Sequence, residues 1–225
     1  VGYGSQSTPT ITHQELIKLD AQGNMYWTKT ISLPDRDMSS NNGCLTPDGG
    51  LAIVGSTWEG GHTSGAFIKT DSAGQVEFAR IYNYGGPATA NLYGVKPLPN
   101  GGYILAGYCM PTISFDWQVW MIETDSLGIP VWANVYGTPG FEFVYDVAIR
   151  PNGGYALVGQ NQVGNNRSMV FVRTDSLGQL EDVKVYDNSI NDRASKVMVT
   201  PDGGYFIAGN TDTTNGGGLW MLKTD

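Results

Sequence analysis

The chain has little of the side-chain chemistry on which many active sites depend. Its 225 residues include two cysteines, Cys44 and Cys109, and two histidines, His13 and His62. At most one disulfide can form, and because the two cysteines occupy non-equivalent places, a bridge and two free thiols are both open. Neither histidine stands at a recognisable spacing from cysteine or carboxylate partners, so the sequence predicts neither a zinc site nor a catalytic triad.

Charge is also sparse, and basic residues are the scarcer kind. Charged residues make up 15% of the chain, with 21 acidic against 13 basic residues and a net charge of −8. Because phosphate contacts require clustered Lys and Arg, this balance excludes a nucleic acid as the expected partner. No apolar run is long enough to span a membrane, and no stretch keeps a helical period.

Glycine, in contrast, is abundant, and much of it stands in two repeated phrases. The first, Pro-Asp/Asn-Gly-Gly, starts at Pro47, Pro99, Pro151 and Pro201, at spacings of 52, 52 and 50 residues. The second, Asp-x-x-Gly, starts at Asp20, Asp71, Asp125 and Asp175. Proline presets φ, glycine takes the left-handed position, and the aspartate side chain accepts from amides of its own turn, so each repeat contains two tight hairpins.

Short apolar segments between the turns read as strands packed on both faces. One set follows the first turn, at 51–55, 103–107, 155–159 and 205–209, and each copy ends in glycine. Bounded by Gly or Asp, such segments are typical of strands covered by other sheets. Large aromatics recur four residues beyond the second turn's glycine, at Trp27, Phe78 and Trp132, whereas the fourth copy has Asp182. We expect these rings to be buried between neighbouring sheets.

Four antiparallel strands in about 50 residues, repeated along the chain, are typical of a β-propeller blade. The sequence therefore predicts one all-β propeller domain over residues 1–225, with about five blades represented. Complete blades are expected near 41–83, 92–136 and 144–187, and partial ones near 1–31 and 195–225. Since the partial blades duplicate each other, we expect a piece of a longer chain or a processed product, with additional blades or strand sharing between copies covering the open edges.

The turn order resembles the layout of WD repeats, without their Gly-His and Trp-Asp pairs. The segment from Leu19 to Trp27 is also similar to the tryptophan-docking motif of quinoprotein propellers. Nearly the whole chain resembles degenerate propeller repeats with a K-T-D-S-x-G-x-x-x-W core and an x-D-G-G-Y strand, which are frequent in secreted and surface proteins of Bacteroidota and some archaea. This resemblance implies an extracellular or cell-surface location and specifies structure far better than activity.

The loops opposite the tight turns vary from repeat to repeat, and function in a repeat scaffold usually depends on such loops. One family is expected at 5–13, 57–64, 109–116, 161–167 and 211–217, and the other at 32–40, 83–91, 137–143 and 188–194. Their unrepeated aromatic and polar residues are the candidate ligand contacts: Trp58, Glu59, His62, Phe115, Asp116 and Phe141. Tyr108 and Trp117 stand at the loop edges. Aromatics among amides suit stacking on sugars or anchoring a protein.

A noncatalytic binding or structural module is the favoured function, with a protein or a neutral glycan as partner. The alternative is a carbohydrate-active hydrolase or lyase, which would require loop carboxylates such as Glu59, Asp116 and Glu142 to converge. No cofactor is expected. Calcium stays open because Asp35, Asp37 and Asn41 lie in an oxygen-rich segment, although it lacks the spacing of an EF-hand.

Overall fold

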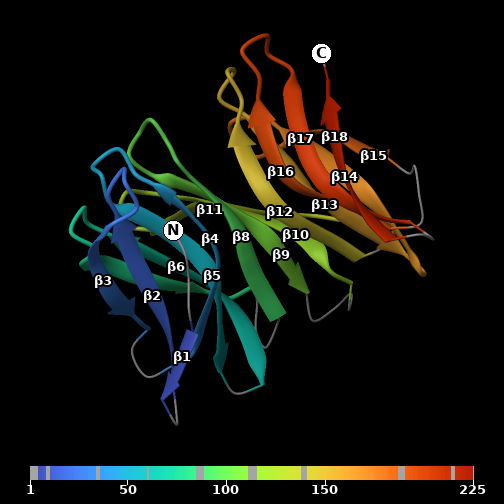
Figure 1. Cartoon of the computed structure of the whole chain (residues 1–225). Coiled ribbons are helices and arrows are strands. Elements are labelled where there is room, and N and C mark those ends of the chain that lie inside the picture. Colours follow the sequence, from blue (N-terminus) through green and yellow to red (C-terminus); the bar gives the residue numbers. More distant parts are fainter. Residues whose placement is uncertain are drawn as a thin grey trace.

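The computed structural model describes residues 5–8, 11–33, 36–59, 61–84, 89–110, 116–137, 141–186, 191–213 and 216–224. These residues form eighteen strands and no helix, which confirms the all-β prediction (Figure 1). Within these ranges, therefore, no helix is present that could cross a membrane.

Antiparallel pairing of consecutive strands gives five groups of strands, which we call sheets 1 to 5, and a parallel bridge joins the last two groups into one seven-stranded sheet. Sheet 1 contains β1 (Ser5–Thr8), β2 (Ile11–Leu19) and β3 (Met25–Ile31). Sheet 2 contains β4 (Met38–Leu45), β5 (Leu51–Glu59), β6 (His62–Thr70) and β7 (Val76–Tyr82). Sheet 3 contains β8 (Thr89–Pro97), β9 (Tyr103–Met110), β10 (Gln118–Thr124) and β11 (Pro130–Tyr136). Sheet 4 contains β12 (Phe141–Ile149), β13 (Tyr155–Val163), β14 (Asn166–Thr174) and β15 (Leu180–Tyr186). Sheet 5 contains β16 (Asn191–Val199), β17 (Tyr205–Thr213) and β18 (Gly216–Lys223).

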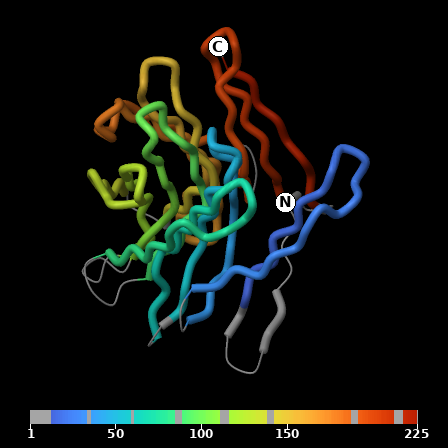
Figure 2. The backbone as a smooth tube through the Cα atoms, turned by 90° about the vertical axis from the view of Figure 1, so that its left-hand side faces the viewer, coloured from blue at the N-terminus to red at the C-terminus, as the bar shows by residue number. Residues whose placement is uncertain are grey.

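The sheets pack face to face in sequence order (Figures 1 and 2). The first strands of sheets 2 to 5, β4, β8, β12 and β16, contact one another in succession, and we call them the inner strands. One parallel bridge, between Arg167 and Asn191, also joins sheet 4 to sheet 5. Apolar clusters fill each space between neighbouring sheets, so the core is a series of inter-sheet layers.

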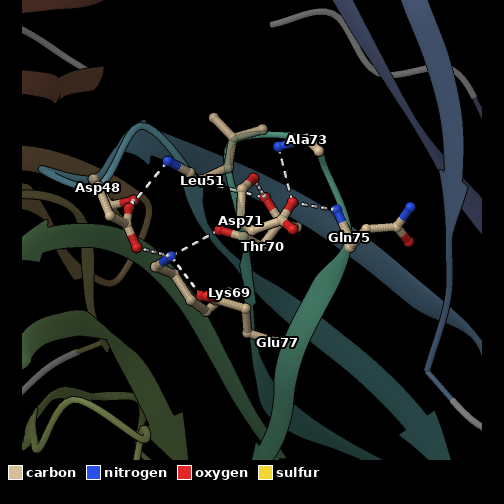
Figure 3. A network of polar contacts seen from close by, with 10 residues as sticks. Asp48, Leu51, Lys69, Thr70, Asp71, Ala73, Gln75 and Glu77 are labelled. Atoms are coloured by element: carbon tan, nitrogen blue, oxygen red, sulfur yellow. Dashed lines mark hydrogen bonds and ion pairs between the residues drawn. The ribbon is translucent and has the colours of Figure 1, made fainter.

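The two turn phrases form the tight turns that the sequence predicts. Gly49, in the first phrase, has φ +81°, and the equivalent glycines of the other three copies are also left-handed. In the second phrase, Asp71 Oδ1 accepts hydrogen bonds from the backbone N of Ala73 (2.9 Å) and of Gln75 (2.8 Å) (Figure 3). Asp20, Asp125 and Asp175 make the same pair of bonds.

A buried lysine ties the two turns of sheet 2 together. Lys69 is 3% exposed, and its Nζ donates at 2.7 Å to Asp48, to Glu77 and to the carbonyl of Thr70 (Figure 3). The hydrogen bond from Lys69 holds the pKa of Asp48 well below its usual range. Burial acts to lower the pKa of Lys69, but the hydrogen bonds to both carboxylates outweigh it and raise that pKa. The ammonium group is therefore fully paired although it is out of water.

Each inner strand carries a β-bulge at the same place in the repeat. The extra residue is Asn41 in β4, Tyr93 in β8, Tyr145 in β12 and Ser195 in β16. A glycine of the second strand lies beside each bulge, and a Cβ on Gly107 would lie 1.9 Å from the carbonyl oxygen of Asn91. Gly55, Gly159 and Gly209 face equally close carbonyls. The repeated glycine that ends each apolar segment is therefore a requirement of the bulge.

Replacing the bulge glycine with alanine, which adds one methyl group, tests how closely the two strands approach each other. Gly107→Ala should lower the free energy of unfolding by about 1–3 kcal/mol, since the strand must move to admit the Cβ. Gly218→Ala, also in a strand but with its nearest neighbouring atom at 3.4 Å, is the matched control. Urea denaturation measures both, and equal losses in the two variants would contradict the proposed role of the bulge.

In sheets 1 to 3, an aromatic ring of the fourth or last strand packs on the Asp-x-x-Gly turn of the next sheet. The rings of Trp27, Phe78 and Trp132 face glycines 74, 128 and 178, where an added Cβ would lie 2.6, 2.7 and 2.6 Å from the ring. All three rings are partly buried against the inter-sheet clusters, rather than fully buried as the sequence predicts, because each packs at the rim of its sheet. Tyr82 adds a hydrogen bond from its hydroxyl to the carbonyl of Gly128 at 2.7 Å.

We expect Trp132→Ala to cost about 2–3 kcal/mol, below the ~3–5 kcal/mol of a fully buried ring. Asp182, at the equivalent place in sheet 4, pairs instead with Arg173 at 2.7 Å, and both side chains are about one-third exposed. Its replacement by alanine should cost under about 1 kcal/mol. Chemical denaturation of the two variants side by side checks the contrast, which a larger loss for Asp182→Ala would reverse.

Four of the predicted variable loops are wrong, because the strands on either side continue through most of each. Over 5–13, β1 and β2 pair up to Thr8 and Ile11. Over 57–64, β5 and β6 pair up to Glu59 and His62, so Trp58 and His62 lie in strands. Likewise, β13 and β14 extend through 161–167, and β17 and β18 through most of 211–217. β12 begins at Phe141, which places Phe141 and Glu142 in a strand as well. Polar composition suggested loops, but continuous antiparallel pairing satisfies the backbone there.

Candidate functional site

Five aromatic side chains of sheets 3 and 4 contact one another beside the inner-strand bulges. They form what we call the inner aromatic cluster: Tyr93, Tyr108, Trp117, Phe143 and Tyr145. Tyr93 stacks on Tyr108 with ring centroids 5.5 Å apart, and meets Tyr145 edge-on at 5.3 Å. Tyr108 lies 4.8 Å from Phe143 and 5.0 Å from Trp117. All five rings are partly buried, so each keeps some surface open to water.

The bulges explain why these rings meet. Tyr93 and Tyr145 are the unpaired residues of the bulges in β8 and β12, so they are released from the regular alternation of the strand. Tyr108 follows the bulge glycine Gly107 on β9. The backbone N of Glu142 donates to the carbonyl of Trp117 at 2.8 Å, which holds the start of β12 against the segment before β10.

Polar side chains flank the cluster on two sides. The guanidinium of Arg193, on β16 of sheet 5, lies over the ring of Tyr145 at 4.7 Å from its centroid, a cation–π distance. On the other side, the Nδ2 of Asn41 donates to Asn91 Oδ1 at 2.6 Å and to the carbonyl of Leu92 at 2.9 Å. The arrangement combines aromatic faces with amides and one cation, drawn from four inner strands.

Two phenols of the cluster, those of Tyr108 and Tyr145, have a raised pKa. Burial raises the pKa of Tyr108, and its hydrogen bond with Tyr93 raises that pKa further. Burial also raises the pKa of Tyr145, and the nearby Arg193 offsets part of the rise. A neutral phenol donates and accepts hydrogen bonds but is a poor nucleophile or base, so these groups suit binding better than proton abstraction.

Titration of the phenols tests this environment. In the folded protein, part of the absorbance change from the twelve tyrosines should appear only above their ordinary pKa of about 10. Tyr108→Phe should remove one of the late-ionising groups, whereas the same protein in denaturant should titrate in one step. A single transition near the ordinary pKa in the folded protein would contradict the burial.

Acidic residues near the cluster are buried or paired. Glu142 is buried at the interface between sheets 3 and 4. Asp146, one residue beyond the bulge, is 2% exposed and accepts from Val197 N at 3.2 Å. Lys96 and Lys196 approach its two carboxylate oxygens at 4.0 and 3.8 Å. Asp146 therefore links the inner strands of sheets 3, 4 and 5, and its charge is offset by two lysines.

The candidate residues from the sequence fall in two places. Trp58 and His62 are exposed on the β5–β6 hairpin of sheet 2, with Trp58 60% exposed. Asp116 is partly buried directly before Trp117 of the cluster. Phe115 lies outside the described residues, as do the side chains of Glu59 and Phe141. The role of these six residues in ligand binding stays a prediction.

The calcium candidates are only partly covered by the structure. Asp35 lies outside the described residues, while the carbonyl of Asp37 accepts from Thr57 Oγ1 at 2.5 Å. Over the ranges that the structure describes, no three His, Cys, Asp or Glu side chains gather as metal ligands, and calcium stays a prediction.

Cys44 and Cys109 are free thiols. Burial raises the pKa of Cys109 to about 12, so it is not a reactive thiolate at neutral pH.

Sequence reasoning missed Tyr93 and Tyr145, because both lie in segments read as core strands, and it passed over Phe143 and Arg193, which lie in the predicted loops 137–143 and 188–194. One signal could have identified two of them. Tyr93 and Tyr145 are 52 residues apart, the spacing of the turn phrases, and the equivalent positions are Asn41 and Ser195. A position that varies inside an otherwise repeated strand indicates a side chain that the core does not determine.

Comparisons with known proteins bear on the fold. No family model matches the chain, and no curated protein matches it. A puromycin hydrolase mutant complexed with PGG is similar at TM-score 0.59 and 12% identity, over 98% of this chain and 35% of that one. A second puromycin hydrolase structure gives 0.57 and 11%, over 92% and 33%. A bifunctional GH43-CE protein of Bacteroides eggerthii gives 0.50 and 12%, over 99% and 32%.

The chain thus spans about a third of the length of these solved structures. At such identities the likeness shows the fold alone, a propeller-like series of antiparallel sheets. The activities that the names of these three proteins state apply to those proteins, and the likeness carries none of them over to this chain.

Proposed function

We propose that the chain is a noncatalytic binding module of propeller type, which contacts a neutral glycan or a protein. The inner aromatic cluster is the observation that supports it. Partly exposed rings flanked by amides and one arginine are the composition typical of surfaces that stack on sugars or anchor a protein side chain. Trp58 and His62, on the exposed hairpin of sheet 2, are proposed as additional contacts.

Electrostatics favours a neutral ligand. The net charge of −8 disfavours an anionic partner, and the cation nearest the cluster, Arg193, already lies over Tyr145. The raised pKa values of Tyr108 and Tyr145 keep these two phenols protonated, so they offer hydrogen bonds to hydroxyl groups without adding charge. Such a surface fits a polyhydroxylated neutral molecule better than a phosphate or a carboxylate.

A carbohydrate-active hydrolase or lyase is the second candidate. The name of the Bacteroides eggerthii protein and the position of Glu142 beside Trp117 favour it. A glycosidase needs two carboxyl groups open to the same sugar. Glu142 is 3% exposed and Asp146 is 2% exposed, so neither carboxyl group is open to a sugar, and binding without catalysis is the better-supported function.

We also propose that the protein is extracellular or at the cell surface. In addition, we infer that the outer face of sheet 5 is covered by another blade or by a second copy of the chain. On sheet 5, Leu219 is 75% exposed, whereas the equivalent residue of sheet 4, Met169, is 1% exposed beneath sheet 5. Met221 and Met198 extend this apolar face. Every earlier sheet has this face packed against its successor, so an uncovered copy indicates a missing neighbour.

A pull-down on immobilised neutral polysaccharides, with glucan, xylan and mannan as the panel, tests the function. We expect the protein to be retained on at least one of them, and Trp117→Ala to weaken retention at least tenfold, about 1.4 kcal/mol. Tyr26→Ala, which removes an exposed ring from sheet 1, is the control and should bind normally. Melting curves show whether each variant is folded.

Two results would contradict the proposal. Retention that survives Trp117→Ala in the folded variant would place binding elsewhere. Release of reducing sugar from the bound polysaccharide, abolished by Glu142→Gln while retention persists, would favour the enzyme.

A further inference from the structure

The outermost strand of sheet 3, β11, is an open sheet edge without charge. It pairs only with β10, so the backbone groups on its other side have no strand partner among the described residues. Its sequence, Pro130–Tyr136, contains no charged residue, whereas β7 and β15, the outermost strands of sheets 2 and 4, carry both acidic and basic residues. Charged side chains are a common means by which proteins protect such edges from pairing with another chain. β11 lacks this protection.

The exposed side chains at the start of β11 are apolar where the neighbouring repeats are polar. Sheets 2 and 4 have glutamine directly after the glycine of the second turn and glutamate two residues later, whereas sheet 3 has Ile129 and Val131 at these positions. Ile129 is 51% exposed and Val131 is 64% exposed. The open edge of sheet 3 is therefore flanked by apolar surface that another strand could cover.

A groove of about 330 Å³ lies between this edge and the outer strand of sheet 2. Ile129, Pro130 and Ala133 line it from sheet 3, and Arg80 and Tyr82 line it from sheet 2. Both sheets have four strands, and sheets 1 and 4 pack against their other faces, so both walls of the groove are complete. The groove is mostly apolar, and Arg80 is the charged residue in its lining.

The guanidinium of Arg80 has more donors than the fold uses. Its Nε donates to the carbonyl of Leu127 at 3.0 Å, and the group lies 5.4 Å from the ring centroid of Phe78. No carboxylate of the described residues forms an ion pair with it. The equivalent residue of sheet 3 is Asn134, whose neutral Nδ2 donates to the carbonyl of Gly178 at 3.0 Å. Because a neutral amide is enough to hold the next turn, the Nη groups and the charge of Arg80 are available to a carboxylate.

We propose that this edge and groove bind an extended segment of a partner protein that carries a carboxylate. The segment adds a strand to β11 through backbone hydrogen bonds, its apolar side chains lie against Ile129 and Val131, and its carboxylate pairs with Arg80. Charge favours this occupant over a second copy, since two chains of net charge −8 repel each other and β11 has no carboxylate to offer Arg80. The site lies on the outer strands, and it is independent of the inner aromatic cluster.

Fluorescence anisotropy with labelled hexapeptides of valine and threonine is the direct test, with one aspartate placed at each position in turn so that every register is sampled. We expect at least one peptide to bind saturably, with a dissociation constant on the order of 0.1 mM. The same peptide with asparagine in place of aspartate should bind about fivefold more weakly, the effect of a partly exposed ion pair. Arg80→Asn copies the residue of sheet 3, so it should abolish this preference while the melting temperature stays nearly unchanged.

Amide hydrogen exchange tests the strand addition separately. The best peptide should slow exchange in β11 and leave it unchanged in β15, the charged edge that serves as the matched control. Ile129→Gln, which restores the residue of sheets 2 and 4, should weaken binding several-fold in a folded protein.

Three results would overturn the proposal. The first is the absence of saturable binding by every peptide of the series to the folded protein. The second is an Arg80→Asn variant that keeps the preference for aspartate. The third is a dimer of the protein without peptide, seen by sedimentation, in which the β11 amides are already protected, because a second copy would then occupy the edge.

Discussion

The structure depends on how closely each bulged inner strand approaches the second strand of its sheet. At Gly107 and its three counterparts, a backbone carbonyl occupies the space in which any other residue would place its Cβ. Glycine at this position lets the strand bulge, and the bulge frees one residue per sheet from the core alternation. The scaffold is thus constant while the freed residue varies, as Asn41, Tyr93, Tyr145 and Ser195. The aromatic cluster exists because two of these residues are tyrosines.

The charged side chains near the tight turns also vary between sheets while their role in the fold is kept. In sheets 2 to 4, the same position on the third strand holds a charged group and provides it with partners, because the neighbouring sheet removes much of its water. Lys69 meets this requirement with two carboxylates, Arg173 with Asp182, and Glu123 with the hydroxyl of Tyr155 and the indole of Trp132. The sign of the charge changes between sheets, and its partners change with it. The repeat therefore conserves a satisfied polar contact rather than a particular ion pair.

The parts of the fold that sequence could predict are those that local chemistry determines. Proline, glycine and the aspartate side chain act within four or five residues, so the turns and the period were readable directly. Hairpin length was not, because all residues from Thr57 to Ser64 except Trp58 are polar or small, and only the cross-strand pairing of 57–59 with 62–64 shows that they continue the sheet. The cluster joins residues up to 52 positions apart through bulges, which leave no local signal. Sequence reasoning reached Tyr108 and Trp117 at the edges of the predicted loops, and missed the inner-strand tyrosines.

Departures from the repeat are compensated by the contacts around them. Asp182 replaces the docking aromatic of sheet 4, yet Tyr205 of the next sheet still packs on an aromatic ring, that of Phe171, with centroids 4.9 Å apart. Asp182 itself is paired with Arg173, so that substitution leaves no lone charge. Leu51 stands where sheets 3 to 5 have a buried tyrosine, and both Leu51 and Trp27 pack against the apolar cluster between sheets 1 and 2. The repeat therefore fixes an apolar contact between neighbouring sheets, while the residues that supply this contact change from one sheet to the next.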